Sequence, residues 1–308
     1  MTGSPTITVR VPASSANLGP GYDAFGLALG LYNEFEVRAA ERWSVRIVGE
    51  GAGLLREDAS NEVVRAMRRV FNEVQAYERA AELVCRNHIP VGRGLGSSAA
   101  AIAGGVVLGN ALTGERLGVQ RLLELATELE GHPDNVAAAL LGGFTVSVQE
   151  AGVVHSVRVD PARGVAAVVV VGATALPTTA ARAALPATVP HADAAANAGR
   201  AALVALGIAT GDAQQLRLGL HDLLHEQYRA PLIDDFTAVR TALEDAGVGP
   251  AVLSGAGSTM LGLVLGEDDA EALGRARQAA DVVRGRLGAD DSTRVLALVV
   301  DRVGAGLV

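Results

Sequence analysis

Residues 90–100, with the sequence PVGRGLGSSAA, place three glycines and two serines directly ahead of a long alanine-rich stretch. The glycines at positions 92, 94 and 96 let the backbone approach a ligand with no Cβ in the way. Two serines, Ser97 and Ser98, then open a helix that we expect to cover residues 98–112. The N-terminal end of a helix offers unpaired N–H groups and the positive end of its dipole. The segment therefore predicts a site for an anion such as a nucleotide phosphate.

This loop differs from two common phosphate-binding patterns. The P-loop needs a lysine next to Ser or Thr, but the chain contains no lysine, and all 26 of its basic residues are arginine. Its glycines are spaced GxGxG, which is not the GxGxxG pattern of dinucleotide-binding folds. Negative charge at this site must therefore be balanced by backbone N–H groups, by a metal ion or by arginine.

The composition argues against several classes of protein. The formal net charge is −8 and the chain has no long basic block, which disfavours a nucleic-acid partner. A single cysteine, Cys85, excludes an intramolecular disulfide and fits a reducing compartment. The N-terminus lacks the pattern of a secretory signal, and no uninterrupted apolar run is long enough to span a membrane. We therefore expect a cytoplasmic protein with no membrane partner.

Strand-like and helix-like segments are mixed along the chain, which predicts an α+β fold. Residues 6–11 alternate as a half-buried strand does, and residues 165–172 form the continuous apolar run of a buried strand. A second glycine-rich turn follows at residues 255–259, far from the first. Because strands and glycine-rich loops occur in both halves, we expect two domains, residues 1–160 and 161–308.

Three separated motifs resemble those of the GHMP small-molecule kinases. They are PASSANLGPGYD at residues 12–23, the glycine-rich loop at residues 90–100, and SGAGST at residues 254–259. Within that superfamily, ANLGPGYD and the segment EGHPDN at residues 130–135 are similar to the homoserine kinases. The motifs occur in the family's order, and the resemblance covers nearly the whole chain.

The resemblance implies a two-domain GHMP kinase fold with the active site between the domains. Its N-terminal domain would be like domain 2 of ribosomal protein S5, and its C-terminal domain would be a ferredoxin-like α/β domain. The implied reaction transfers a phosphoryl group from ATP, with Mg²⁺, to the side-chain hydroxyl of L-homoserine. The product, O-phospho-L-homoserine, leads to threonine. A homodimer is also implied.

The resemblance assigns nucleotide and metal contacts. The expected ATP-binding residues of the glycine-rich loop are Pro90, Gly92, Arg93, Gly94, Leu95, Gly96, Ser97, Ser98 and Ala99. Asn61 would lie near the adenine, although it could equally serve only as an N-terminal helix residue after Ser60. For Mg²⁺, which prefers oxygen ligands, we expect the hydroxyl of Ser98 and the carboxylate of Glu124, chosen over the nearby Glu128 and Glu130.

The amino-acid substrate carries both charges, so its pocket needs both signs. The residues expected around it are Asn17, Asp23, His132, Asp134, Thr178, Arg182, Arg229, Gly255 and Gly257. A guanidinium pairs well with a carboxylate, so one of the two arginines would hold the substrate carboxylate and the other the γ-phosphate. Which arginine does which stays open, and His132 could instead cap the helix that begins at Pro133.

Asn135 stands where many superfamily members carry an aspartate that acts as general base. An amide cannot accept a proton, so the resemblance implies transfer without a dedicated carboxylate base. Asn135, Arg182, Arg229 and Ser98 would then form the catalytic group, acting by positioning and charge stabilisation. Ser258, in the C-terminal turn, stands where many relatives carry proline.

Two other functions compete with this one. The first is a kinase of the same superfamily that acts on mevalonate, a diphosphocytidyl polyol, shikimate or a sugar. Asn135 and a pocket with two arginines and two aspartates favour an amino acid instead. The second is a non-catalytic relative that binds a nucleotide or metabolite as a regulator, but Ser98, a candidate metal carboxylate and the glycine-rich loop are all present.

Overall fold

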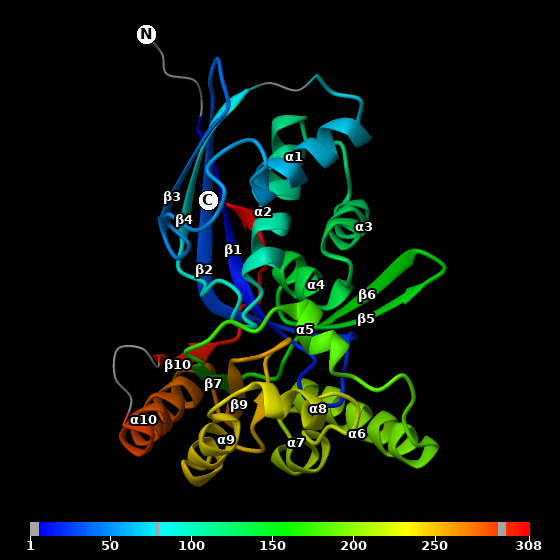
Figure 1. Ribbon diagram of the computed structural model, residues 1–308, viewed down its shortest axis with the longest axis vertical. Helices are drawn as coiled ribbons and strands as arrows, with labels where there is room; N and C mark the ends of the chain where they lie inside the picture. The colour runs from blue at the N-terminus through cyan, green and yellow to red at the C-terminus, as the bar shows by residue number, and fades with distance from the viewer. Residues whose placement is uncertain (1–5, 78–79, 289–293) are drawn as a thin grey trace.

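The computed structural model describes residues 6–77, 80–288 and 294–308, and it divides into two stacked halves, each built on one sheet (Figure 1). The first sheet has seven strands, of which five follow the order β11-β1-β2-β4-β3, and a β5–β6 hairpin attaches to β2. Its strands are β1 (Ile7–Ala16), β2 (Phe25–Ala39), β3 (Ser44–Gly49), β4 (Ala81–Asn87), β5 (Phe144–Glu150), β6 (Val153–Val159) and β11 (Gly306–Leu307).

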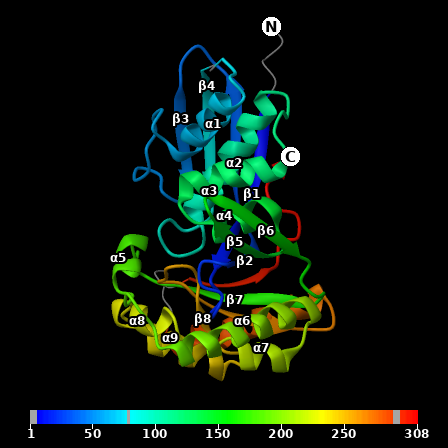
Figure 2. The ribbon, with the colours of Figure 1, turned by 90° about the vertical axis from the view of Figure 1, so that its right-hand side faces the viewer.

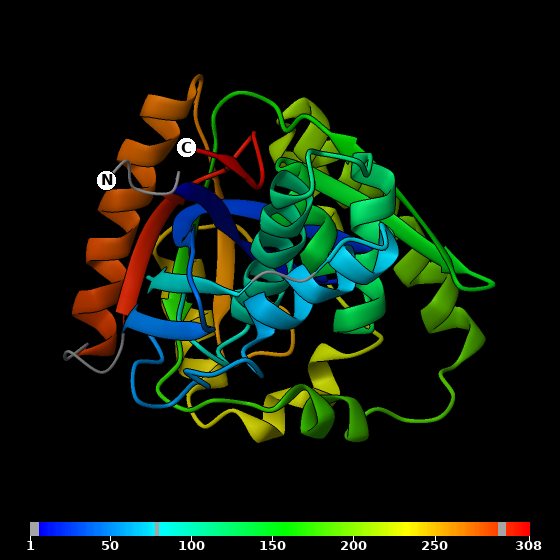
Figure 3. The ribbon, with the colours of Figure 1, turned by 90° about the horizontal axis from the view of Figure 1, so that it is seen from above.

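Helices of the first half gather on one side of its strands, as the view from above shows (Figure 3). They are α1 (Glu62–Glu73), α2 (Ser97–Leu112), α3 (Val119–Glu130) and α4 (Pro133–Leu141). The central helix α2 is apolar all round, as expected of a helix packed between neighbours. Its glycines make room for that packing, since a Cβ on Gly104 would lie 2.3 Å from the Phe35 ring.

The second sheet has four antiparallel strands in the order β10-β7-β9-β8. They are β7 (Val165–Val171), β8 (Val252–Leu253), β9 (Met260–Leu265) and β10 (Arg294–Val299). In chain order they form a β-α-β-β-α-β unit with strand order 4-1-3-2, as a ferredoxin-like domain does. The expected two-domain α+β fold is therefore confirmed. All seven residues of β7 are buried, which explains its continuous apolar sequence.

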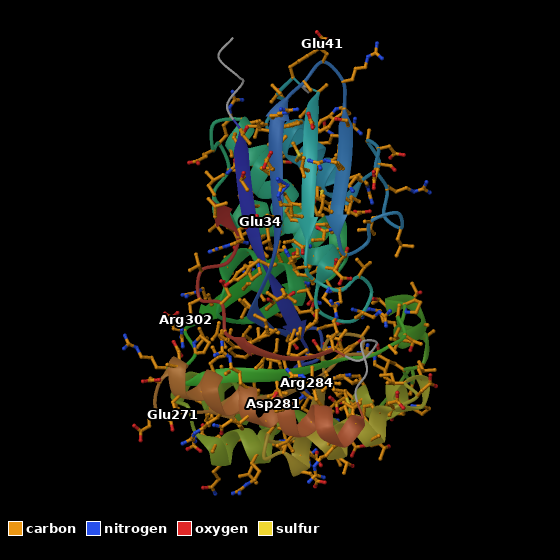
Figure 4. The ribbon with its side chains drawn as sticks, turned by 90° about the vertical axis from the view of Figure 1, so that its left-hand side faces the viewer. Glu34, Glu41, Glu271, Asp281, Arg284 and Arg302 are labelled. Atoms are coloured by element: carbon orange, nitrogen blue, oxygen red, sulfur yellow. The ribbon has the colours of Figure 1, made fainter. Side chains whose placement is uncertain are left out.

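The helices of the second half cover the outer face of this sheet and the junction with the first half (Figure 2). They are α5 (Thr178–Ala183), α6 (His191–Thr210), α7 (Ala213–Gly219), α8 (Glu226–Arg229), the short 3₁₀ turn Ala230–Leu232, α9 (Phe236–Asp245) and α10 (Asp269–Leu287). Figure 4 shows α10 along the sheet, with Glu271, Asp281 and Arg284 labelled, and Arg284 Nη2 donates to the Val295 carbonyl oxygen of β10 at 2.9 Å. Among the described residues, no helix is both long and apolar enough to cross a membrane.

The C-terminal segment returns to the first half instead of ending in the second. Val9 pairs with Leu307, and Leu29 forms a bridge with Val300. Arg302 donates to the carbonyl oxygens of Pro161 and Ala162 at 2.6 and 2.9 Å, which ties this segment to the chain that connects the two sheets. The expected division at 160/161 thus separates β6 from β7. It assigns β11 to the second domain, however, although β11 pairs with β1 in the first sheet.

Candidate active site

A small cavity of about 120 Å³ lies where the three glycine-containing motifs meet between the two halves. Its lining residues come from both domains: Asn17, Asp23, Gly92, Gly94, Gly96, Ser97, Ser98, Glu130, His132, Asp134, Asn135, Leu176, Thr178, Arg182, Arg229, Gly255, Ala256 and Gly257. Figure 2 shows α5, which begins at Thr178, at this junction. We refer to this cavity as the central cleft.

Glycine in the 90–97 loop permits backbone contacts that a side chain would block. Gly94 has φ +85°, and a Cβ there would lie 2.2 Å from the Ser254 carbonyl oxygen. Gly96 precedes α2 with φ +69°, and a Cβ there would lie 2.1 Å from Ser14 Oγ. No side chain of the described residues caps the first N–H groups of α2. The helix end therefore remains available to an anion in the cleft.

Hydrogen bonds join the three motifs into one frame. Ser254 Oγ donates to the Gly94 carbonyl oxygen at 2.7 Å and lies 2.8 Å from Ser15 Oγ, from which it can accept. Asn17 Nδ2 donates to the Gly255 carbonyl oxygen at 2.8 Å. The Thr259 N–H donates to the carbonyl oxygen of Arg93 at 3.1 Å. Segments that are far apart in sequence are thus fixed relative to one another before any ligand binds.

Glu130 is the carboxylate that faces Ser98. The Ser98 hydroxyl donates to Glu130 Oε2 at 2.9 Å, and both residues line the central cleft. Burial raises the pKa of Glu130 above its usual range, and this effect outweighs the charge of His132 and the Ser98 hydrogen bond, which lower it. A partly buried carboxylate next to a hydroxyl offers the hard oxygen donors that Mg²⁺ takes, so these residues fit the ion.

The structure does not bring Glu124, the expected metal carboxylate, to Ser98. The Glu124 carboxylate accepts from Arg121 Nη1 at 2.7 Å and from Gln120 Nε2 at 3.1 Å, and it is absent from the cleft lining. Gln120 in turn donates to the Val154 carbonyl oxygen of β6, so this face of α3 turns toward the hairpin. Glu130 ends the same helix on a different face, because six residues at 100° each rotate the side chain by about 240°.

His132, Asp134 and Asn135 form a second group at the start of α4. His132 Nδ1 lies 2.6 Å from Asp134 Oδ1, and the same oxygen accepts from the Asn135 N–H at 2.7 Å. Burial alone would lower the pKa of His132, but the hydrogen bond and charge of Asp134 raise it above its ordinary value. Asn135 Oδ1 accepts from Ser14 Oγ at 2.9 Å, which leaves the amide Nδ2 as its group for a ligand.

The two arginines of the cleft differ in how their charge is balanced. Arg182 donates to both carboxylate oxygens of Asp23 at 2.9 and 2.8 Å, and to the Tyr22 hydroxyl at 3.0 Å. Arg229 is only 2% exposed, and among the described residues no carboxylate pairs with it. Its partners are neutral acceptors, including the carbonyl oxygens of Gly255 and Ala181. Arg229 therefore brings an unbalanced positive charge to the cleft.

A larger and more apolar cavity of about 400 Å³ adjoins the central cleft and shares Gly92, Ser97 and Ser98 with it. Leu54, Leu55, Val63 and Val91 contribute apolar lining. Asn61 also lines this cavity. Its side chain caps α1, because Oδ1 accepts from the Val63 N–H at 3.0 Å while Nδ2 donates to the Arg56 carbonyl oxygen at 2.8 Å. We refer to this space as the apolar cavity.

Comparison with known proteins connects this site to a family. The sequence matches the family described as GHMP kinases N terminal domain over residues 61–143, and GHMP kinases C terminal over residues 200–282. A homoserine kinase of Streptomyces coelicolor is 48% identical over 290 residues, which cover 92% of each chain. The chain belongs to the homoserine kinase family.

Other members of the homoserine kinase family agree with this placement. A homoserine kinase of Moorella thermoacetica is 42% identical over 84% of this chain and 87% of that protein. The crystal structure of a homoserine kinase from Cytophaga hutchinsonii superposes with a TM-score of 0.87 at 28% identity, covering 98% of this chain and 97% of that one.

Most residues predicted from the homoserine kinase motifs do line the two cavities, but four loop residues do not. Arg93 Nη1 donates to the Gly172 carbonyl oxygen at 2.6 Å, so its charge faces the second domain and not the cleft. Pro90, Leu95 and Ala99 are buried and shape the loop from behind. Ser258 donates its hydroxyl to the Thr174 carbonyl oxygen at 2.5 Å.

Sequence reasoning did not select three residues of this homoserine kinase family site. Glu130 is the first residue of the EGHPDN segment and was weighed as the metal carboxylate, but Glu124 was preferred. Tyr22 lies in the first motif, and its ring lies 5.3 Å from the Arg229 guanidinium. Ser14, which orients Asn135, also lies in that motif, but the sequence gives no sign that the two side chains meet.

Proposed function

We propose that the protein is an ATP-dependent kinase that phosphorylates the side-chain hydroxyl of L-homoserine. The observation that carries this proposal is the central cleft, where the open N-terminus of α2 meets a lining with both signs of charge. In the reaction, the hydroxyl oxygen bonds to the γ-phosphorus while the bond from that phosphorus to the ADP oxygen breaks. The products are O-phospho-L-homoserine, which leads to threonine, and ADP.

The nucleotide would span the two cavities. The apolar cavity suits the adenine ring, and the residues it shares with the cleft, Gly92, Ser97 and Ser98, place the phosphates at the N-terminus of α2. Glu130 and the Ser98 hydroxyl would hold Mg²⁺ together with phosphate oxygens and water. When bound, the ion neutralises charge on the phosphates during transfer.

The amino acid would lie on the other side of the α2 N-terminus. Arg229 is the stronger candidate for the substrate carboxylate, because Asp23 already balances Arg182. The substrate ammonium would then lie toward Asp23 and Asp134, where the negative charge of the cleft gathers. Thr178 and the turn at Gly255 and Gly257 limit the size of the acceptor.

The hydroxyl proton would pass to an oxygen of the transferring phosphoryl group. Asn135, held by Ser14, offers only an amide N–H toward the ligand, so it can stabilise developing negative charge but cannot accept the proton. The transition state is loose and leaves little charge on the nucleophile early in the reaction. A cytoplasmic location and a homodimer remain predictions from the family resemblance.

The test measures ADP release with Mg-ATP and a panel of acceptors: L-homoserine, mevalonate, shikimate and galactose. We expect turnover with homoserine only. Ser98→Ala should abolish it, whereas Ser44→Ala, at the exposed start of β3, should not. Turnover with another acceptor alone would overturn the substrate assignment. ATP binding without turnover on any acceptor would favour a regulatory protein instead.

A further inference from the structure

His225 is a fully buried histidine that lies outside the cleft lining but contacts one of its arginines. It directly precedes α8, and its ring bridges two segments. Nε2 lies 2.9 Å from the Gly19 carbonyl oxygen, within the first motif. Nδ1 lies 3.2 Å from Arg229 Nη1.

The two partners determine where the ring proton sits. A carbonyl oxygen only accepts, so Nε2 must carry the hydrogen that bonds to Gly19. An arginine N–H only donates, so Nδ1 must present a lone pair to Arg229. Both conditions hold together only in the neutral Nε2–H tautomer. Burial lowers the pKa of His225, which favours the same neutral form although the Asp222 carboxylate, 3.8 Å from Nε2, opposes it.

A neutral partner matters because of the role of Arg229. Its other acceptors are backbone carbonyl oxygens, and the Tyr22 ring packs 5.3 Å from its guanidinium. Asp222 is close in sequence, but its carboxylate accepts from the N–H groups of Leu224, His225 and Glu226. The guanidinium is thus held in place by His225 and by carbonyl oxygens, and its positive charge stays unbalanced.

We propose that His225 is a positioning residue that holds Arg229 through a neutral acceptor, so that the full charge of Arg229 serves the carboxylate of the amino-acid substrate. The proposal rests on the proposed function, in which Arg229 binds that carboxylate. An acidic residue at position 225 would form a stronger bond with Arg229, but it would compete with the substrate for the same guanidinium. With a neutral partner, Arg229 forms no buried ion pair within the described residues, and its guanidinium binds the substrate anion more tightly.

The bond from Nε2 to Gly19 extends the same role to the loop between β1 and β2, residues 17–24, which we refer to as the substrate loop. Asn197 Nδ2 donates to the neighbouring Pro20 carbonyl oxygen at 2.7 Å, so two side chains of the second domain hold this loop from behind. The loop continues to Asp23, which pairs with Arg182. His225 thus fixes Arg229 and the substrate loop relative to each other with a single ring.

The test compares two variants of equal shape, His225→Asn and His225→Asp. Both place an oxygen near the position of Nδ1, and both lose the bond to Gly19, so they differ only in charge. We measure KM for L-homoserine, KM for ATP, kcat and thermal unfolding of each full-length variant. His225→Asp should raise KM for homoserine about 10-fold or more above that of His225→Asn, because a charged hydrogen bond to the substrate is weakened. KM for ATP should be equal in the two variants.

A purely structural role predicts that the two variants differ in thermal unfolding but not in KM for homoserine, because the charge beside Arg229 would then act only on the stability of the fold. Equal KM values for homoserine in the two variants, or a lower value in His225→Asp, would overturn the proposal. If the wild-type protein shows no homoserine turnover, the proposed function and this proposal both fail. If the wild type turns over homoserine and only the expected order of KM values is absent, the proposed function stands and this proposal alone fails.

Discussion

The side chain of Asn135 is held by the Ser14 hydroxyl. Because the Ser14 hydroxyl donates to Oδ1, the Nδ2 group is the one available to a ligand in the cleft. A donor at this place stabilises a negative oxygen, and an acceptor would repel it. With this orientation of Asn135, a carboxylate in place of its amide is predicted to lower the rate of phosphoryl transfer.

Replacing Asn135 with aspartate should slow the reaction. Ser14 would still donate to one carboxylate oxygen, and the other would bring a negative charge toward the phosphates. We expect kcat to fall at least about 10-fold, in the range seen when one such donor is lost. Steady-state ADP release between pH 6 and 9 is the measurement. A faster variant at any of these pH values would show that a carboxylate base helps here and would contradict proton transfer to the phosphoryl group.

Two glutamates on α3 allow a matched test of the metal site. Glu130→Gln should raise the Mg²⁺ concentration for half-maximal rate and lower kcat roughly 100-fold, since the ion contributes several kcal/mol. Glu124→Gln should leave both values near those of the wild type, because that carboxylate pairs with Arg121 away from the cleft. Titrating Mg²⁺ at fixed ATP decides between them. The reverse result would restore Glu124 as the metal carboxylate.

These glutamates also show how far the sequence could predict the site. The family resemblance predicted Ser98, Asp134 and Asn135 at the site, and all three line the cleft, because they lie in short segments of fixed conformation. Spacing from Asn135 back to Glu124 crosses a helix end, the left-handed Gly131 and a new helix start. The direction of a side chain across such a junction depends on packing, and no single sequence reveals it.

At the level of elements, the start of α2 depends on a left-handed residue with no room for a side chain. The sequence predicted that Gly94 and Gly96 let the backbone approach a ligand, and both have positive φ. It did not reveal that protein atoms also approach them, since the Ser254 carbonyl oxygen and Ser14 Oγ come from distant segments. Local sequence thus predicts the backbone conformation, while its partners follow from the fold.

Gly96→Ala should damage both the fold and the nucleotide site. The alanine would be strained at φ +69°, and its Cβ would lie 2.1 Å from Ser14 Oγ and 3.1 Å from Asn135 Oδ1. We expect a loss of about 1–3 kcal/mol in the free energy of unfolding, together with a higher KM for ATP. Denaturant unfolding and ADP release measure the two effects.

Gly285→Ala is the matched control for this substitution. Gly285 lies in α10 with φ in the ordinary range, and a Cβ added there would meet no atom of another element within 4 Å. Alanine should therefore stabilise the helix by about 0.5–1 kcal/mol. If Gly96→Ala were as stable as Gly285→Ala, the close packing at the α2 N-terminus would be refuted.

For the whole molecule, the site is built by long-range pairing that the sequence does not display. The cleft combines β1, the α2 loop and the turn after β8, and the C-terminal β11 closes the first sheet beside β1. The order of motifs indicated a two-domain kinase, and the 4-1-3-2 strand order of the second sheet agrees with it. The return of the last residues to the first sheet was missed because two residues of β11 carry no detectable strand pattern.

Stability of the whole molecule should depend on pH through Glu226, which joins α8 to β8. Its carboxylate is 5% exposed, and it accepts from the Leu253 N–H at 2.7 Å and from Arg240 at 2.6 Å. Burial raises the pKa of Glu226 to about 7, against the lowering effects of the Leu253 N–H and Arg240. The raised pKa means that the native state keeps a proton that the unfolded chain has already lost.

Between the ordinary pKa of 4.5 and about 7, the contribution of Glu226 to the free energy of unfolding should therefore fall as pH rises. Glu226→Gln keeps an acceptor for Leu253 but cannot ionise. Over this pH range its unfolding free energy should therefore fall less than that of the wild type, and the difference between the two falls should reach up to about 3 kcal/mol. Denaturant unfolding at pH 5, 6, 7 and 8 measures the difference. Glu41→Gln, on the exposed loop between β2 and β3 (Figure 4), should follow the wild type. Parallel curves for Glu226→Gln and the wild type would show that Glu226 stays ionised in the native state, with Arg240 balancing its charge throughout.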